Sequence, residues 1–319
     1  KAGYDQKIAT GTICAAGTLG QIIPPSIVLV LLATILQGAN EEAAMLKGDL
    51  APDPVTAIDL FAGALLPGLM LVVMFIIFIY FYARIFPNSC PPIQTVKSRS
   101  EIYKEAFKSI FPPLILIVLV LGSILMGVAT PTESASVGAV GAAIIAFTKG
   151  ELTFQNLKDV SLNTVKLSSF VFVILIGASM FSLVFRGFNG DAMIEHFLGS
   201  LPGGLFTALL IVMIAIFFLG FFLDYIEIIF VIVPLVGPIL IANGADPLWL
   251  GILISLNLQT SFLTPPFGFS LFFLRGVAPN EIQTRNMYKG VMPFIGIQVL
   301  AIIIVALFPS IATWLPNLM

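Results

Sequence analysis

The apolar positions along this chain form long, uninterrupted runs. They do not alternate every second residue, as they would in a half-buried strand, so they predict α-helices. About 20 helical residues cross the hydrocarbon of a bilayer, where a helix satisfies its own backbone hydrogen bonds. The runs that are long enough are 59–83, 112–128, 132–148, 165–185, 204–222, 225–242 and 288–308. The predicted fold class is therefore an all-α polytopic membrane protein.

Composition supports this class and excludes others. Hydrophobic residues make up 58% of the chain and charged residues 10%, whereas a soluble domain carries about 25% charged residues. The chain has no phosphate-binding loop motif and no Cys/His cluster that suggests a metal site. A net charge of -2 and the lack of a basic cluster interleaved with aromatic residues argue against nucleic acid.

Two further runs, 8–37 and 247–274, contain the pairs Pro24-Pro25 and Pro265-Pro266. A proline removes a backbone donor and clashes with the carbonyl one turn earlier, so two in succession break a helix. These runs are long enough to span only as interrupted helices.

Basic residues predict the orientation, because Lys and Arg near the ends of spans stay cytoplasmic. The segment 84–108 holds five of them, whereas 38–58 holds four acidic residues and only Lys47. We therefore predict that 84–108 faces the cytoplasm and 38–58 faces outward. This topology places 13 of the 15 Lys and Arg residues inside.

The same topology requires that 204–242 enter and leave the membrane on the outer side. The segment holds two apolar halves around residues 220–224, so we predict a re-entrant helical hairpin. The alternative is two full spans, which would put Asp224 and Glu227 in a cytoplasmic loop.

The two interrupted helices are then predicted to be antiparallel. Corresponding broken helices in two inverted halves point to the binding site of a secondary transporter, because freed carbonyls and half-helix ends coordinate ions and substrate groups. The fold is narrowed to an inverted repeat with broken helices and a re-entrant hairpin. The alternative is a pair of kinks that serve packing.

Polar residues flank both breaks, and their neutral oxygens suit Na⁺. The residue before a proline leaves the α region, so the carbonyl of Thr264 is expected to point toward the hairpin tip. Asp224 either supports an ion site or caps the next helix. The candidate Na⁺ ligands are Thr18, Gly20, Gln21, Pro24, Gly220, Asp224, Gln259, Thr264 and Pro265, and the candidate substrate contacts are Ser26, Asn257, Ser261 and Gly268.

One helix start is visible in the sequence. Thr130-Pro131-Thr132-Glu133 has the form of a capping box with proline at the first helical position. It predicts a helix that begins at Pro131.

Four motifs follow one another across nearly the whole chain. They read GYDQKIATGTICAAGTLGQIIPPSIVLVLLA at 3–33, ATPTESASVGAV at 129–140, FLGFFLDYIEIIFVIVPLVGPIL at 218–240 and SLNLQTSFLTPPFGFSLFFLRGVAP at 255–279. Together they resemble the large membrane subunit of the tripartite ATP-independent periplasmic (TRAP) transporters.

The resemblance implies a secondary transporter of the bacterial inner membrane, not an enzyme, with Na⁺ as coupling ion and no cofactor. It implies a small TRAP membrane subunit and a periplasmic substrate-binding protein that delivers a small organic acid as partners. The implied fold is an elevator, in which a transport domain with two hairpins slides against a scaffold. The segment 204–242 would be the outward-opening hairpin, and the inward-opening hairpin would precede Lys1, so the chain is expected to be the C-terminal part of a longer protein.

The resulting domain prediction divides the chain into six parts. They are the broken helix of the first repeat (1–37), a periplasmic acidic loop (38–58), an arm helix with a basic cytoplasmic connector (59–111), scaffold helices of the second repeat (112–200), the hairpin and broken helix of the transport domain (201–275) and a C-terminal helix (276–319).

A channel is the main alternative from the sequence, because hairpins and broken helices also build pores. An intramembrane acid/base enzyme is disfavoured, because Asp224 and Glu227 lie on one predicted helix and no second helix supplies a partner.

Overall fold

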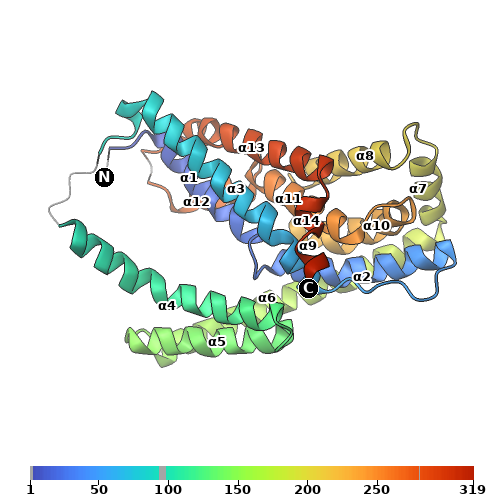
Figure 1. Ribbon diagram of the computed structural model, residues 1–319, viewed down its shortest axis with the longest axis horizontal. Coiled ribbons are helices and arrows are strands. Elements are labelled where there is room, and N and C mark those ends of the chain that lie inside the picture. The colour runs from blue at the N-terminus through green and yellow to red at the C-terminus, as the bar shows by residue number, and fades with distance from the viewer. Residues whose placement is uncertain (1–2, 93–97, 280) are drawn as a thin grey trace. The chain divides into compact units, whose positions relative to one another are not determined.

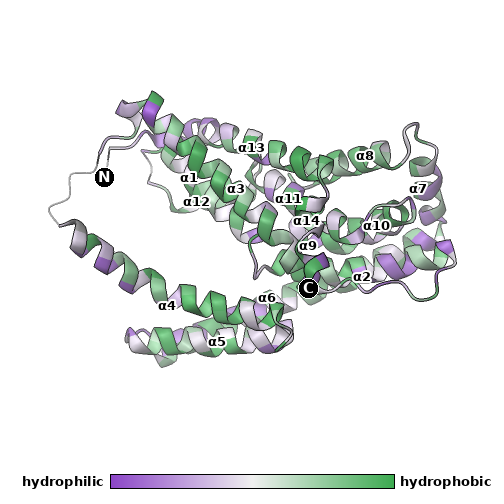
Figure 2. Cartoon of the chain, in the orientation of Figure 1, coloured by the Kyte–Doolittle hydropathy of each residue, from purple (hydrophilic) through white to green (hydrophobic). Residues whose placement is uncertain are grey.

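The computed structural model describes residues 3–92, 98–279 and 281–319, and these residues form helices without any strand (Figure 1). Six helices in this part of the chain are long and apolar enough to cross a membrane, and apolar residues cover most of their length (Figure 2). The helices are α1 (Gln6–Thr18), η1 (Leu19–Gln21), α2 (Ile27–Lys47), α3 (Ala57–Ile85), η2 (Pro87–Ser89), α4 (Arg99–Leu125), α5 (Pro131–Thr148), α6 (Phe154–Gly187), α7 (Gly190–Gly199), α8 (Gly204–Leu219), α9 (Tyr225–Glu227), η3 (Ile228–Ile232), α10 (Val233–Ala242), α11 (Pro247–Leu263), α12 (Phe269–Val277), α13 (Thr284–Leu307), α14 (Ser310–Thr313) and η4 (Pro316–Leu318).

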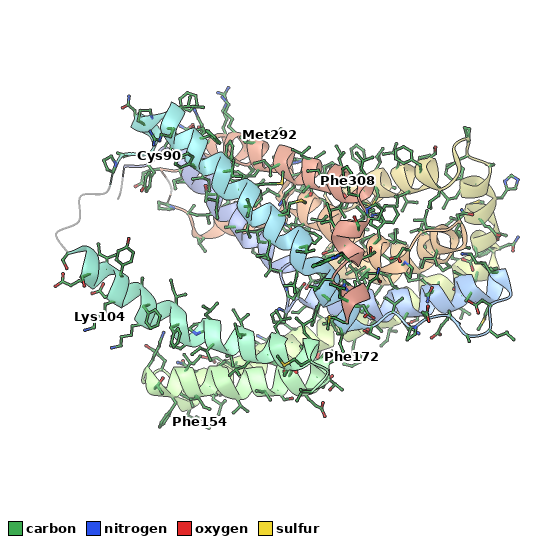
Figure 3. All side chains as sticks on the ribbon, viewed as in Figure 1. Cys90, Lys104, Phe154, Phe172, Met292 and Phe308 are labelled. Carbon is green, nitrogen blue, oxygen red and sulfur yellow. The ribbon has the colours of Figure 1, made fainter. Side chains whose placement is uncertain are left out.

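Many large apolar side chains remain exposed on the helix surfaces. Met292 and Phe308 are 56% and 58% exposed and stand clear of the ribbon (Figure 3). Such faces are expected where lipid rather than water surrounds a helix, and the all-α polytopic membrane fold predicted from the sequence is confirmed.

The chain divides into two compact units, Lys1–Pro91 with Ile174–Met319, and Pro92–Val173. The smaller unit holds α4, α5 and the first part of α6. The predicted capping box is present, because Glu133 N donates to Thr130 Oγ1 at 3.3 Å and Thr130 N donates to Glu133 Oε2 at 2.8 Å. α5 therefore begins at Pro131, as the sequence predicts.

In the larger unit, α1 and α13 pack side by side and run parallel (Figure 1). At one end Asn286 Nδ2 donates to Gln6 Oε1 at 2.9 Å. At the other end Gln298 Nε2 donates to Thr18 Oγ1 at 3.3 Å. The first contact joins residues 6 and 286 and the second joins residues 18 and 298, so the two helices run in the same direction.

The helix α11 runs antiparallel to α13. Trp249 Nε1 donates to Val305 O at 2.8 Å, and Tyr288 Oη donates to Pro266 O at 3.0 Å. Since α1 is parallel to α13, the broken helices α1–α2 and α11–α12 enter their breaks in opposite directions. This confirms the predicted antiparallel pair.

The helices differ from the prediction in several places. The predicted loop 38–58 is helical up to Lys47, because strong helix formers continue α2 until Gly48, with φ of 75°, ends it. The predicted connector ends at Ser98, whose capping box starts α4, so Lys104 and Lys108 lie on a helix. The predicted span 132–148 forms α5 but is not among the six candidate spans.

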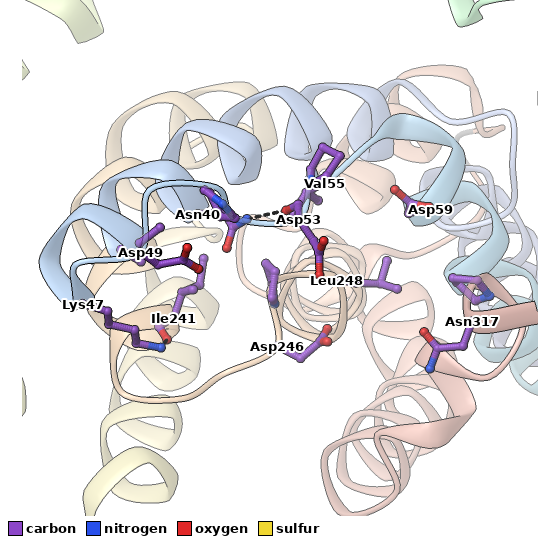
Figure 4. A pocket seen from close by; sticks show the side chains of 16 residues that line it. Asn40, Lys47, Asp49, Asp53, Val55, Asp59, Ile241, Asp246, Leu248 and Asn317 are labelled. Carbon is purple, nitrogen blue, oxygen red and sulfur yellow. Dashed lines mark hydrogen bonds between the residues drawn. The ribbon is translucent and has the colours of Figure 1, made fainter. Parts of the chain in front are cut away.

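A pocket of about 420 Å³ opens between the remaining loop, 48–56, and the start of α11 (Figure 4). Asn40 Nδ2 donates to Asp53 O at 2.8 Å and holds the loop against α2. The acidic side chains of the lining are Asp49, Asp53, Asp59 and Asp246.

Cysteine labelling tests the predicted orientation. A cysteine at Asp53 or Asn243, both exposed, is expected to react with a membrane-impermeant thiol reagent in intact cells, and a cysteine at Ser98 is not. The background carries alanine at Cys14 and Cys90. A cysteine at Ser98 that reacts only after permeabilisation supports the topology, and one that reacts in intact cells overturns it.

Candidate ion and substrate site

Each break replaces a missing backbone donor by a serine hydroxyl. The second proline of each pair has no N–H for the carbonyl four residues earlier. In the first break, residues 22–26, Ser26 Oγ donates to Gln21 O at 2.5 Å. In the second break, residues 264–268, the carbonyl at the equivalent position is that of Phe262, and it accepts from Ser270 Oγ at 3.1 Å. The two breaks therefore share one local solution.

Other carbonyls at the breaks stay free. The carbonyl oxygens of Gly20, Pro24, Leu263 and Pro265 accept no hydrogen bond from the residues that the structure describes. A carbonyl that leaves the helical ladder remains a strong acceptor. Three of these residues, all except Leu263, were candidates from the sequence.

Thr264 partly follows its prediction. Its φ of -87° and ψ of 127° are extended, so it has left the helix as expected before a proline. Its carbonyl is not free, because Gly268 N donates to it at 3.0 Å and closes the turn. Its hydroxyl donates to Thr260 O at 2.7 Å, which leaves the lone pairs of Oγ1 as the ligand that this residue offers.

The hairpin tip, residues 220–224, packs against the end of α11. A Cβ on Gly220 would lie 2.7 Å from Ser261 Cβ and closer still to Ser261 Oγ, so only glycine fits. The rings of Phe222 and Phe267 lie 5.2 Å apart between centroids. The tip therefore sits beside the second break, as the hairpin prediction requires.

The side chains of Asp224 and Glu227 both accept backbone hydrogen bonds at the N-terminus of α9. Tyr225 N donates to Asp224 Oδ1 at 2.7 Å, and Asp224 N donates to Glu227 Oε2 at 3.2 Å. The capping role for Asp224 is thus present at the start of α9.

The ends of the two broken helices meet at a second pocket of about 450 Å³. Thr18 and Gln21 line it from the first, and Phe262 and Ser270 line it from the second. The Oε1 atom of Gln21 is buried and has no hydrogen-bond partner within the described chain. Thr18 and Gln21 therefore lie next to residues of the second broken helix.

Two candidates lie elsewhere. Asn257 Nδ2 donates to Met213 O at 2.7 Å and joins α11 to the hairpin helix α8. Gln259 is fully buried, and it stands two residues before Ser261, which puts it on the far side of α11 from the hairpin tip. The structure does not bring Gln259 to the tip.

Three contributors were missed from the sequence. Gln298 holds Thr18, Ser270 binds Phe262 O, and Tyr288 binds Pro266 O. Gln298 had a signal, since it is an amide inside the apolar run 288–308. Ser270 and Tyr288 had none, because their roles depend on how the chain folds back.

The comparison with protein families decides the identity of this arrangement. The family model "Tripartite ATP-independent periplasmic transporter, DctM component" matches residues 1–311. The chain belongs to the DctM family of TRAP transporter components. This TRAP subunit is a transporter permease component of a multi-pass membrane type, and not an enzyme.

Named relatives agree with the family. The chain is 33% identical over 340 residues to the C4-dicarboxylate TRAP transporter large permease protein DctM of Vibrio cholerae, all of this chain matching 70% of that protein. It is 27% identical over 319 residues to the sialic acid TRAP transporter permease protein SiaT of Haemophilus influenzae, all of it matching 48% of that protein. It is 28% identical over 323 residues to the ectoine TRAP transporter large permease protein TeaC of Halomonas elongata, all of it matching 69% of that protein.

Gly220→Ala tests the contact between the hairpin tip and Ser261 in this TRAP subunit. The added Cβ collides with Ser261, so we expect a loss of about 1–3 kcal/mol in unfolding free energy, typical of overpacking, measured by thermal unfolding of the purified protein. Ser261→Gly in the same chain should restore most of it. Gly199→Ala is the control, because nothing lies within 4 Å of its added Cβ. Equal loss in Gly220→Ala and the control would contradict the contact.

Proposed function

We propose that this TRAP subunit carries out Na⁺-coupled uptake of a small organic acid. A periplasmic substrate-binding protein delivers the acid, and a small membrane subunit completes the transporter in the bacterial inner membrane. The observation that carries the proposal is the set of free backbone carbonyls at two antiparallel breaks, one of them beside the hairpin tip.

The oxygen set favours a monovalent ion. The carbonyls of Gly20, Pro24 and Pro265 and the hydroxyl of Thr264 are neutral, hard ligands. Neutral oxygens in this number suit Na⁺, whereas Ca²⁺ and Mg²⁺ sites usually include carboxylates. Asp224 caps α9 at the hairpin tip, and its negative charge there favours a cation at the nearby second break.

The substrate class rests on the helix ends and on the relatives. α2 and α12 both begin directly after a break, and the N-terminus of a helix favours negative charge. Gly268 caps α12 without a side-chain hydrogen bond, so backbone N–H groups there are left for an anion. C4-dicarboxylate and sialic acid, the substrates in the names of two relatives, are both carboxylic acids.

Reconstitution tests the function against a channel. The complete transporter in liposomes, with its small subunit inserted and its binding protein outside, should accumulate a radiolabelled C4-dicarboxylate only under an inward Na⁺ gradient. Replacing external Na⁺ by K⁺ or omitting the binding protein should abolish uptake. Conductance that needs no binding protein would favour the channel, and uptake that ignores Na⁺ would refute the coupling.

Thr264→Val tests the side-chain ligand. The change keeps the shape and β-branching but deletes the hydroxyl, so the Na⁺ concentration for half-maximal uptake should rise roughly five- to thirty-fold, as expected for a loss of about 1–2 kcal/mol. Thr34→Val is the matched control, because Thr34 Oγ1 donates to Val30 O in the same four-residue pattern away from the breaks. An unchanged Na⁺ dependence in Thr264→Val would show that the hydroxyl of Thr264 is not a ligand and would remove this residue from the proposed ion site.

A further inference from the structure

Fully buried polar atoms without partners gather on α11 and α13, outside the set of ligands proposed above. Ser255 and Gln259 are 0% exposed and Gln298 is 1% exposed. Ser255 Oγ, both amide atoms of Gln259 and Gln298 Oε1 have no hydrogen-bond partner within the described residues. Buried polar groups in native proteins are almost always paired, with protein or with ordered water.

The neighbours of α11 are known on three sides. Trp249 faces α13 through its bond to Val305 O. Asn257 faces α8 and Ser261 faces the hairpin tip. Gly251 faces α2 and α3, because its added Cβ would lie 2.6 Å from Leu36 Cδ1 and 2.9 Å from Leu60 Cδ2.

At 3.6 residues per turn, Ser255 and Gln259 fall in the remaining sector, between the Gly251 side and the Trp249 side. They are four residues apart and therefore share a face. α1 packs against both α11 and α13, and because α8, the hairpin tip, α2 and α3 occupy other faces of α11, we infer that α1 lies next to this sector. Gln298 enters the same region, because its Nε2 atom binds Thr18 at the end of α1.

The three side chains also lie at nearly one level along the helices. The Trp249–Val305 bond fixes the register of the antiparallel pair. Gln298 stands seven residues before Val305, two turns along the same face of α13, and Ser255 stands six residues after Trp249. Gln259 is about one turn beyond Ser255. All three are thus within reach of one or two small bridging molecules.

The chemistry of the unpaired atoms selects the occupant. A cation would satisfy the oxygens of Ser255, Gln259 and Gln298 but would repel the Nε2 donor of Gln259, and turning that amide over only exchanges its two ends. Water both donates and accepts, and it occupies internal sites that offer two to four polar partners. The set of donors and acceptors therefore matches water better than it matches Na⁺.

We propose that Ser255, Gln259 and Gln298 form an internal hydration site between α11, α13 and the end of α1. The bound water joins the helix that precedes the second break to the helix that holds Thr18 at the first. This role does not depend on which solute the transporter carries.

High-resolution density of the complete transporter tests the site directly. Density for water within hydrogen-bond distance of both the Gln259 and Gln298 amides supports the proposal. A direct hydrogen bond between the two amides, or the absence of any density between them, overturns it. Density that appears in Na⁺ and disappears in K⁺ also overturns it, because the occupant would then be the cation.

Thermal unfolding of the full chain gives an independent readout. Gln259→Leu and Gln298→Leu should each lower the midpoint temperature of unfolding, because each removes one partner of the water and leaves the other polar groups without a hydrogen bond. The double variant should lower the midpoint by less than the sum of the two single changes. Gln283→Leu is the matched control, since Gln283 is exposed and makes no capping bond at the start of α13. A midpoint that rises in either single variant would refute a hydrated site.

Discussion

The absence of a backbone N–H on proline is the constraint on which this structure depends. Two adjacent prolines in a helix withdraw two donors, and a buried carbonyl without a donor is costly. At each break one carbonyl recovers a partner from a serine hydroxyl, Ser26 in the first and Ser270 in the second. The carbonyl of Gly20, four residues before Pro24, does not recover one, and the carbonyl of Pro265, inside the second break, also accepts none from the described residues. The same chemistry thus stabilises the break and leaves ligands at it.

The helix α13 packs against both broken helices and helps to hold the two breaks in place. A Cβ on Gly290 would lie 2.9 Å from the carbonyl carbon of Lys7 and closer still to its oxygen, so the backbones of α1 and α13 approach as closely as glycine allows. Farther along the same pair, Gln298 donates to Thr18 at the end of α1, one η1 turn before the first break. Tyr288, also on α13, binds Pro266 O in the second. One continuous helix therefore contacts both interrupted ones, and this fixes where the two breaks stand relative to each other.

The sequence predicted what composition and proline chemistry control. Long apolar runs located the helices, the two Pro-Pro pairs located the breaks, and Thr130 with Glu133 located a helix start. The prediction for 38–58 was wrong up to Lys47, because the loop was begun where the apolar run ends, whereas Glu41 and Glu42 are good helix formers within α2. The placement of Gln259 could not be predicted, because α11 is buried on every side and has no polar face that indicates its neighbours. Pairs such as Ser270 with Phe262 O arise only when the chain turns back.

The hairpin differs from the breaks in how it is held. Its tip meets the second break through a glycine contact at Gly220 and a ring contact at Phe222, neither of which is a hydrogen bond. Its second arm contains the π-helical turn η3, Ile228–Ile232, and α10 contains Pro234 and Pro238, features that weaken the regular hydrogen-bond ladder. The breaks, by contrast, are closed by serine and tyrosine hydrogen bonds. The hairpin tip is therefore seated on the end of α11 and the second break by side-chain packing, whereas each break is closed by hydrogen bonds.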